Sequence, residues 1–86
     1  MDARNRAILD FTVAFCAKHE YGPTIREIAE GVMEICEESK TPSSSIIANR
    51  VDKLIASGFI RRIPIRDRNL RATEKGFRFV AKIKQE

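Results

Sequence analysis

The clearest pattern in the chain is an apolar stripe at helical spacing, bounded by signals for both helix ends. Three apolar residues recur four and three positions apart, as on one face of a helix: Ile47, Val51 and Leu54. Thr41 suits a helix N-cap and Pro42 the first helical position, while Gly58 can adopt the left-handed conformation that ends a helix. The pattern therefore predicts a helix over residues 42–57.

Two further helices are predicted before it. Residues 3–19 carry large apolar groups at intervals of three and four, and the Gly-Pro pair that follows breaks this pattern. Thr24 and Glu27 have the spacing of a capping box, so a second helix begins there. Its apolar stripe continues through Ile35, and we expect this helix to extend to about Glu38.

After the third helix the period changes to that of strands. Residues 59–63 predict one strand, residues 66–69 a turn and residues 70–73 a returning strand. Thr73 or Glu74 then opens a last helix, with Phe77, Val80, Ala81 and Ile83 expected to make apolar contacts. The whole chain, 1–86, is predicted to be a single winged helix-turn-helix domain. Its fold class is mainly α with a small β-hairpin: a three-helix core, a two-stranded wing and a C-terminal helix.

Charge is unevenly distributed along this plan. The net charge is +4, but residues 1–58 hold seven Lys/Arg and nine Asp/Glu, whereas residues 59–86 hold nine and three. A basic hairpin and last helix indicate nucleic acid or another anionic surface as partner, although a solvated basic face is a common alternative. An apolar share of 43% fits a folded globular chain.

The remaining composition narrows the class of protein. No apolar run approaches the roughly 20 residues of a membrane span, and no signal peptide is evident, so we expect a cytoplasmic protein without a membrane partner. Cys16 and Cys36 are expected to be buried free thiols, with a disulfide left open. His19 and Cys16 lie one turn apart, but a four-ligand metal site needs a further ligand that no motif supplies. We expect no enzyme activity, cofactor, metal or small-molecule ligand.

The outward side of the predicted third helix suits close approach to a DNA major groove. Its side chains are short, hydrogen-bonding or basic: Ser44, Ser45, Ala48, Asn49 and Lys53. Asn49 is the best candidate for base reading, because an amide pairs well with adenine N6 and N7. The alternative for each is a solvated helix residue.

Two stretches carry a resemblance to known families. Residues 21–32, Tyr-Gly-Pro-Thr-Ile-Arg-Glu-Ile-Ala-Glu-Gly-Val, resemble the second-helix segment of the LexA-type repressor DNA-binding domain. Residues 43–47 and 58–62 resemble that family's recognition helix and first wing strand, and residues 51–62 are also similar to MarR-type regulators. The resemblance implies a DNA-binding transcriptional regulator with double-stranded DNA as partner, and we expect it to be a repressor.

Carried over by position, the resemblance places base-reading sites on five residues: Ser43, Ser45, Ile46, Ala48 and Asn49. The serines are alternatively helix caps and phosphate contacts, and Arg50 either reaches a phosphate or lies along the core stripe. On the wing, Arg66 and Arg68 flank the turn and are candidates for the minor groove or phosphates. Three strand arginines are candidates for backbone contact: Arg61, Arg62 and Arg71.

The chain also departs from the family. A turn normally follows the position of Val32, whereas here about one and a half to two extra helical turns intervene. They carry Glu34, Glu37 and Glu38, so the extension faces away from DNA or the domain does not bind DNA as the family does. LexA-type repressors also continue into a self-cleaving peptidase domain that this chain does not contain, so we do not expect self-cleavage.

Two questions stay open at this point. A homodimer on two half-sites is expected to strengthen binding, with the last helix (Phe77, Phe79, Val80) as candidate contact surface and packing on the first helix as the alternative. The competing function is a winged-helix protein-interaction module in a larger assembly, which the acidic extension favours. Salt dependence separates the two, because phosphate contacts weaken steeply with salt.

Overall fold

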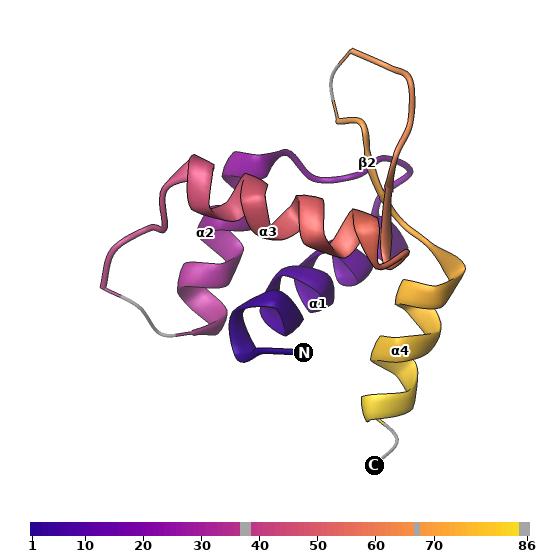
Figure 1. Ribbon diagram of the computed structural model, residues 1–86, viewed down its shortest axis with the longest axis horizontal. Helices are drawn as coiled ribbons and strands as arrows, with labels where there is room; N and C mark the ends of the chain where they lie inside the picture. Colours follow the sequence, from indigo (N-terminus) through magenta and orange to yellow (C-terminus); the bar gives the residue numbers. More distant parts are fainter. Residues whose placement is uncertain (37–38, 67, 85–86) are drawn as a thin grey trace.

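The computed structural model describes residues 1–36, 39–66 and 68–84, and Figure 1 shows their arrangement. Within these residues the chain forms four helices and a two-stranded antiparallel hairpin, in the order α1 (Ala3–Lys18), α2 (Ile25–Ile35), α3 (Ser44–Ala56), β1 (Ile60–Arg62), β2 (Leu70–Ala72) and α4 (Glu74–Lys84). The hairpin rises beyond the helices as a wing, and α4 lies on the opposite side of the strands (Figure 1). The expected winged-helix architecture is confirmed.

The first two helices begin with side-chain caps. Asp2 accepts a hydrogen bond from the Asn5 backbone N–H at 2.8 Å at the start of α1. Thr24 and Glu27 form the expected capping box on α2: the Thr24 hydroxyl accepts from the Glu27 N–H at 3.1 Å, and the Glu27 carboxylate accepts from the Thr24 N–H at 2.9 Å. Two of the backbone donors left free at a helix start are thereby satisfied.

The predicted cap of α3 was wrong by two residues. Ser43 is the N-cap, with extended backbone, and its hydroxyl accepts from the Ile46 N–H at 3.3 Å. Pro42 therefore precedes the helix, and the Thr41 hydroxyl donates to the Met33 sulfur at 3.1 Å instead of capping. The end of α3 was placed correctly, because Ser57 is its C-cap and Gly58 has a φ of 85°.

Helix α2 ends earlier than the stripe predicted. Its last helical residue is Ile35, with Cys36 as C-cap, and its last buried residue is Val32. Ile35 is 51% exposed, whereas the adjacent Cys36 is half-buried and packs against the core. The predicted residues Glu37 and Glu38 lie outside the described part of the chain.

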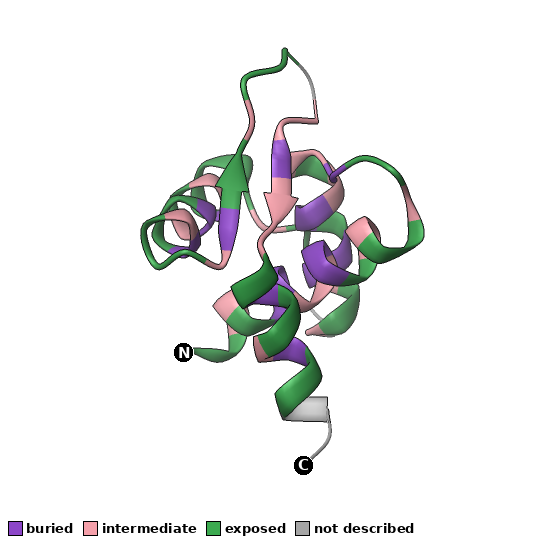
Figure 2. Ribbon diagram, turned by 90° about the vertical axis from the view of Figure 1, so that its right-hand side faces the viewer, coloured by how far each residue is buried: buried purple, intermediate pink, exposed green. Residues whose placement is uncertain are grey.

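The core lies where the three N-terminal helices, the hairpin and α4 meet (Figure 2). The helices contribute most of it: Ala7, Ile8, Leu9 and Val13 from α1, Ile28, Ala29 and Val32 from α2, Ile47, Val51 and Leu54 from α3, and Val80 from α4. Each strand adds one residue, Ile60 from β1 and Leu70 from β2. The three stripe residues of α3 are thus all buried, as predicted.

Helices α1 and α2 cross closely at Gly31. A Cβ atom at that position would lie 2.2 Å from the ring of Phe11. Glycine costs roughly 1 kcal/mol relative to alanine within a helix, and this contact is the reason for it here.

The strands are shorter than predicted, although the pairing continues past them. Arg61 lies opposite Arg71 in the register, and the Ile63 N–H donates to the Asn69 carbonyl at 2.8 Å beyond β1. The base of the wing meets the α1–α2 connection at Gly22, where a Cβ atom would lie 1.6 Å from the Leu70 carbonyl oxygen.

Helix α4 is capped by Thr73, whose hydroxyl accepts from the Gly76 N–H at 3.1 Å. Val80 is buried as predicted, and Phe79 packs on Phe59 with ring centroids 5.1 Å apart. Phe77 and Ala81 were assigned wrongly, because both are exposed on the solvent side of this helix, and the side chain of Ile83 lies outside the part that the structure describes. None of the helices in the described residues is long and apolar enough to span a membrane.

Candidate nucleic-acid interface

The side of α3 opposite the core is exposed, and most of its side chains make no polar contact with other described residues; Asp52, which pairs with Arg62, is the exception. We call the rest of this side the α3 outer face; its exposed members are Ser44, Ser45, Ile46, Asn49 and Lys53. Ala48, half-buried, lies between them. In the part of the chain that the structure describes, no polar side chain of this face forms a hydrogen bond or ion pair. Its donors and acceptors are therefore available to a partner.

Ser43 and Arg50, also predicted to contact DNA, already have partners. The Ser43 hydroxyl is occupied by capping. Arg50 Nη1 donates to both carboxylate oxygens of Asp2, at 3.0 and 2.9 Å, and to Asn5 Oδ1 at 3.0 Å. The Asn5 backbone N–H, and then the Arg50 side chain, lower the pKa of the Asp2 carboxyl. Arg50 thus joins α3 to the cap of α1.

One of the two arginines of β1, Arg62, lies within reach of α3. Arg61 and Arg62 are both exposed, and Arg62 makes only a long ion pair of 3.7 Å with Asp52 on α3. Exposed pairs at this distance contribute little and give way easily to other partners. Arg71, opposite Arg61 on β2, is half-buried, and its Nη1 atom is buried without a hydrogen-bond partner among the described residues.

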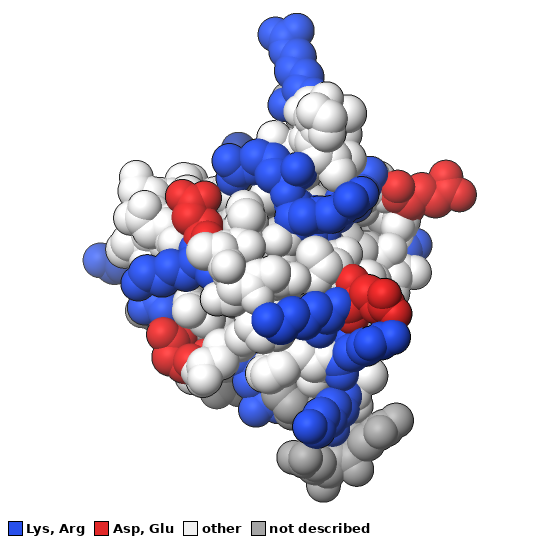
Figure 3. All heavy atoms as spheres, turned by 45° about the vertical axis from the view of Figure 1, so that its right-hand side comes forward, with Lys and Arg blue, Asp and Glu red and all other residues white. Residues whose placement is uncertain are grey.

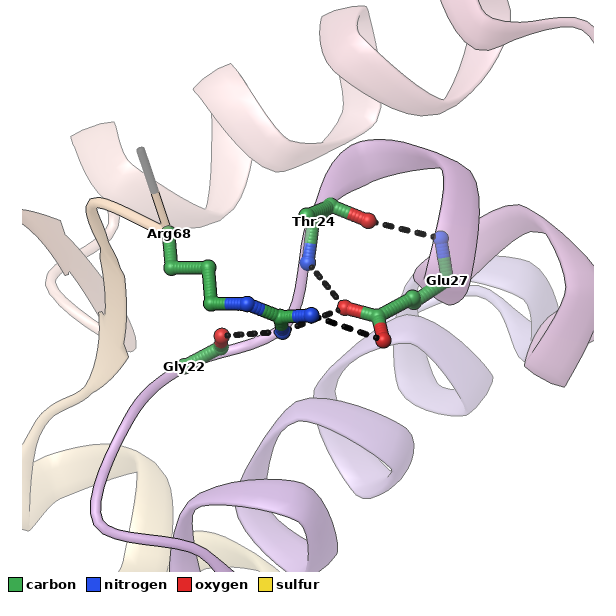
Figure 4. A network of polar contacts seen from close by, with 4 residues as sticks. All are labelled: Gly22, Thr24, Glu27 and Arg68. Atoms are coloured by element: carbon green, nitrogen blue, oxygen red, sulfur yellow. Dashed lines mark hydrogen bonds and ion pairs between the residues drawn. The ribbon is translucent and has the colours of Figure 1, made fainter. Parts of the chain in front are cut away.

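The two arginines at the wing turn differ sharply. Arg66 is exposed and makes no ion pair or hydrogen bond within the described residues. Arg68 instead lies against α2 (Figure 4): its Nη1 and Nη2 donate to the two Glu27 carboxylate oxygens at 2.7 and 3.3 Å, and Nη1 also approaches the Gly22 carbonyl at 3.3 Å. Arg68, predicted as a candidate for the minor groove or for phosphates, is thus already paired within the protein.

The Arg68 contacts extend to the aromatic end of α1. Its guanidinium carbon lies 4.6 Å from the ring centroid of Tyr21 and 5.9 Å from that of Phe15, within the range of cation–π attraction. His19 packs on the same two rings, at 4.4 Å from Phe15 and 5.1 Å from Tyr21. The single histidine is thus part of an aromatic cluster.

Both cysteines are half-buried free thiols, so the open question of a disulfide is answered. The described residues contain no group of three His, Cys, Asp or Glu side chains placed to hold a metal ion.

Basic side chains extend over the face shown in Figure 3, from the wing at the top toward α4 below, with separate acidic groups between them. Sequence reasoning missed one basic contact of this region: Lys75 Nζ donates to the Ser57 carbonyl at 2.7 Å and lies 4.6 Å from the Phe59 ring centroid. A cation at the end of a helix satisfies carbonyls that have no partner in the helix, so Lys75 completes the end of α3.

Sequence reasoning also missed the apolar tip of the wing. Ile65 is 48% exposed, and it stands between exposed Pro64 and Arg66. The alternation of apolar and polar residues that marks the strand ends before Ile65. The sequence pattern therefore gave no sign that Ile65 is exposed.

Comparison with protein-family models gives a match. The family model described as the LexA DNA binding domain matches residues 1–69, which include the three N-terminal helices and most of the wing. No curated protein matches the chain.

Proposed function

The chain belongs to the LexA DNA-binding domain family, whose function is DNA binding by a winged helix, and on that premise we propose that it is a sequence-specific transcriptional repressor acting on double-stranded DNA in the cytoplasm. In this proposal α3 lies in the major groove and the wing, residues 59–73, lies on the backbone or in the minor groove. The observation that carries it is the α3 outer face, exposed and free of internal polar contacts beside exposed wing arginines.

We divide the candidate contacts into two groups by their exposure and chemistry. Base reading is assigned to the short side chains at the middle of the outer face: Ser45, Ile46, Ala48 and Asn49. Phosphate contacts are assigned to exposed polar and basic groups around it: Ser44, Lys53, Arg61, Arg62 and Arg66. Four residues first counted among the contacts are left out of both groups: Ser43, Arg50 and Arg68 already have partners within the protein, and Arg71 is half-buried.

A single module of this size buries only about 600–1,000 Å² of protein surface on DNA. Two copies on half-sites one helical turn apart would bind more tightly, and we include this arrangement in the proposal. Of the residues considered for contact between copies, Phe77 is exposed, whereas Val80 is in the core and Phe79 packs on Phe59.

The test is selection from a random duplex library, followed by salt titration on the selected site. We expect one enriched motif, and Asn49→Ala should relax preference at one base position and cost about 1–3 kcal/mol of binding free energy on that motif. Lys53→Ala should reduce the salt slope by about 1, whereas replacing Lys82, which is also exposed but lies on α4, by alanine should leave the slope unchanged.

Equal affinity for all duplexes would contradict base reading. Equal effects of the two lysine substitutions would contradict the position of α3. Binding to a protein partner with little salt dependence, and none to DNA, would favour the interaction-module alternative.

A further inference from the structure

Arg68 has an unusual backbone conformation for its residue type. Its φ is 53°, and no other non-glycine residue among those the structure describes has a positive φ. Residues with a side chain seldom adopt this conformation unless their surroundings hold them there. We therefore expect the contacts of the Arg68 side chain to hold its backbone in this conformation.

Three neighbouring groups hold the guanidinium in place. Glu27 binds it through both carboxylate oxygens, and the Gly22 carbonyl also accepts from Nη1 (Figure 4). The Tyr21 ring centroid lies 4.6 Å from its central carbon. A planar fork of donors fits such an arrangement, and an ammonium group does not reproduce it. Both charged side chains are about a third exposed, so the pair lies at the surface but against other atoms.

Glu27 has two functions at once. Its Oε1 atom accepts from the Thr24 N–H, which closes the capping box of α2, and from Arg68 Nη1. One carboxylate thereby connects the first turn of α2 with the second arm of the wing, 41 residues further along the chain. The start of the helix-turn-helix unit and the wing are held in one arrangement by this group.

We propose that Gly22, Glu27 and Arg68 form a wing latch, in which Arg68 is a positioning residue that holds the wing so that Arg66 reaches DNA. This inference rests on the proposed DNA-binding function and reverses the role expected of Arg68 from its place at the turn. A guanidinium already neutralised by a carboxylate is a poor phosphate contact, because the phosphate must displace that carboxylate. Arg66, two residues earlier, has no such partner in the described chain.

The two roles of Arg68 predict opposite effects of changing Glu27. Glu27→Gln keeps the capping box, since glutamine serves at that position, but removes the charge that binds Arg68. If the latch positions the wing, this variant lowers affinity for the selected duplex about fivefold, and the Glu27→Gln/Arg68→Gln double variant is no weaker than either single variant. If Arg68 binds phosphate, Glu27→Gln tightens binding, because it frees the cation and removes a negative charge.

A conservative variant and a matched control sharpen the result. Arg68→Lys keeps the charge, so a phosphate contact would be largely retained; the latch would be lost, and affinity should again fall about fivefold with an unchanged salt slope. Arg66→Gln should reduce that slope by about 1. Retained affinity in Arg68→Lys, or a slope reduced in Arg68→Gln as in Arg66→Gln, would overturn the proposal.

A measurement without DNA separates failure of the latch from failure of the proposed function. In the free protein, hydrogen exchange of the Ile63 amide, which is bonded across the wing to Asn69, should accelerate about fivefold in Glu27→Gln and Arg68→Lys but not in Arg66→Gln. Equal exchange in all variants would overturn the latch. If the variants show this difference in exchange but the wild-type protein binds no duplex, the wing latch is supported and only the proposed function is contradicted.

Discussion

Helix α3 and the wing are positioned by different forces. Three fully or almost fully buried apolar residues hold α3 in the core, so its opposite face needs no polar contacts of its own. The wing has one buried residue on each strand and is held in addition by Arg68 on Glu27. An element with a large apolar side can leave its other side entirely to a partner, whereas a small hairpin uses part of its charge for its own placement. The number of arginines on a wing is therefore not the number of its contacts with DNA.

The largest loss of stability is expected when the apolar contacts that hold α3 in the core are removed. Ile47 is fully buried, so Ile47→Ala should reduce the free energy of unfolding by about 3 kcal/mol, through lost burial and the cavity that remains. Its neighbour Ile46 is 46% exposed, and Ile46→Ala should change stability by less than about 0.5 kcal/mol. Urea denaturation measures both, and comparable losses would show that α3 is not oriented as described.

A smaller effect is expected at the base of the wing. Gly22→Ala places a Cβ atom on the Leu70 carbonyl, which cannot move without the strand, so we expect a loss of about 2 kcal/mol together with a displaced wing. Gly58→Ala is the control, because its backbone is left-handed but its Cβ would find only ordinary contacts; it should cost about 1 kcal/mol. Thermal unfolding and the amide spectrum of the wing test this, and a larger loss in Gly58→Ala would contradict it.

The smallest expected effect is the pH dependence of the wing latch. The Thr24 backbone N–H, and then Arg68, lower the pKa of the Glu27 carboxyl below its ordinary value of 4.5. A carboxyl with a lowered pKa in the folded state stabilises the fold above its unfolded pKa, and this contribution disappears as pH falls through the folded value. Water screens a pair that is a third exposed, so the contribution is well below about 1 kcal/mol.

Wild type should therefore lose stability below about pH 4.5 more steeply than Glu27→Gln does. Asp2 also has a lowered pKa and must be replaced by Asn in both chains before they are compared. Urea denaturation at several pH values measures the difference, and parallel curves would show that Glu27 is not held as described.

Local sequence patterns predicted the helices, and the errors in placing them were confined to helix ends. The capping box at Thr24, the stripe of α3 and the left-handed Gly58 were readable because each depends on residues within four positions. The cap of α3 was misplaced because Thr41 and Ser43 both offer hydroxyl groups, and only the bond from Thr41 to Met33 decides between them.

The candidate site was less predictable than the fold. The exposed residues of α3 follow from its stripe, but Arg50 meets Asp2 over 48 residues and Arg68 meets Glu27 over 41. Pairs so distant along the chain leave no periodic signal, so a basic residue that binds the protein looks like one that binds a partner. The same reason applies to Phe77 and Phe79, whose exposure depends on how α4 approaches Phe59.

The crossing of α1 and α2 implies a rule for sequence variation in this fold. The obstacle to a side chain at Gly31 is the ring of Phe11, which is itself a side chain and can be replaced. A larger residue at position 31 is therefore compatible with the fold when position 11 becomes smaller, and the two positions should vary as a pair. The obstacle at Gly22 is a backbone carbonyl, which every residue at position 70 possesses. No compensating substitution exists there, so glycine at position 22 should persist wherever the wing docks in this way.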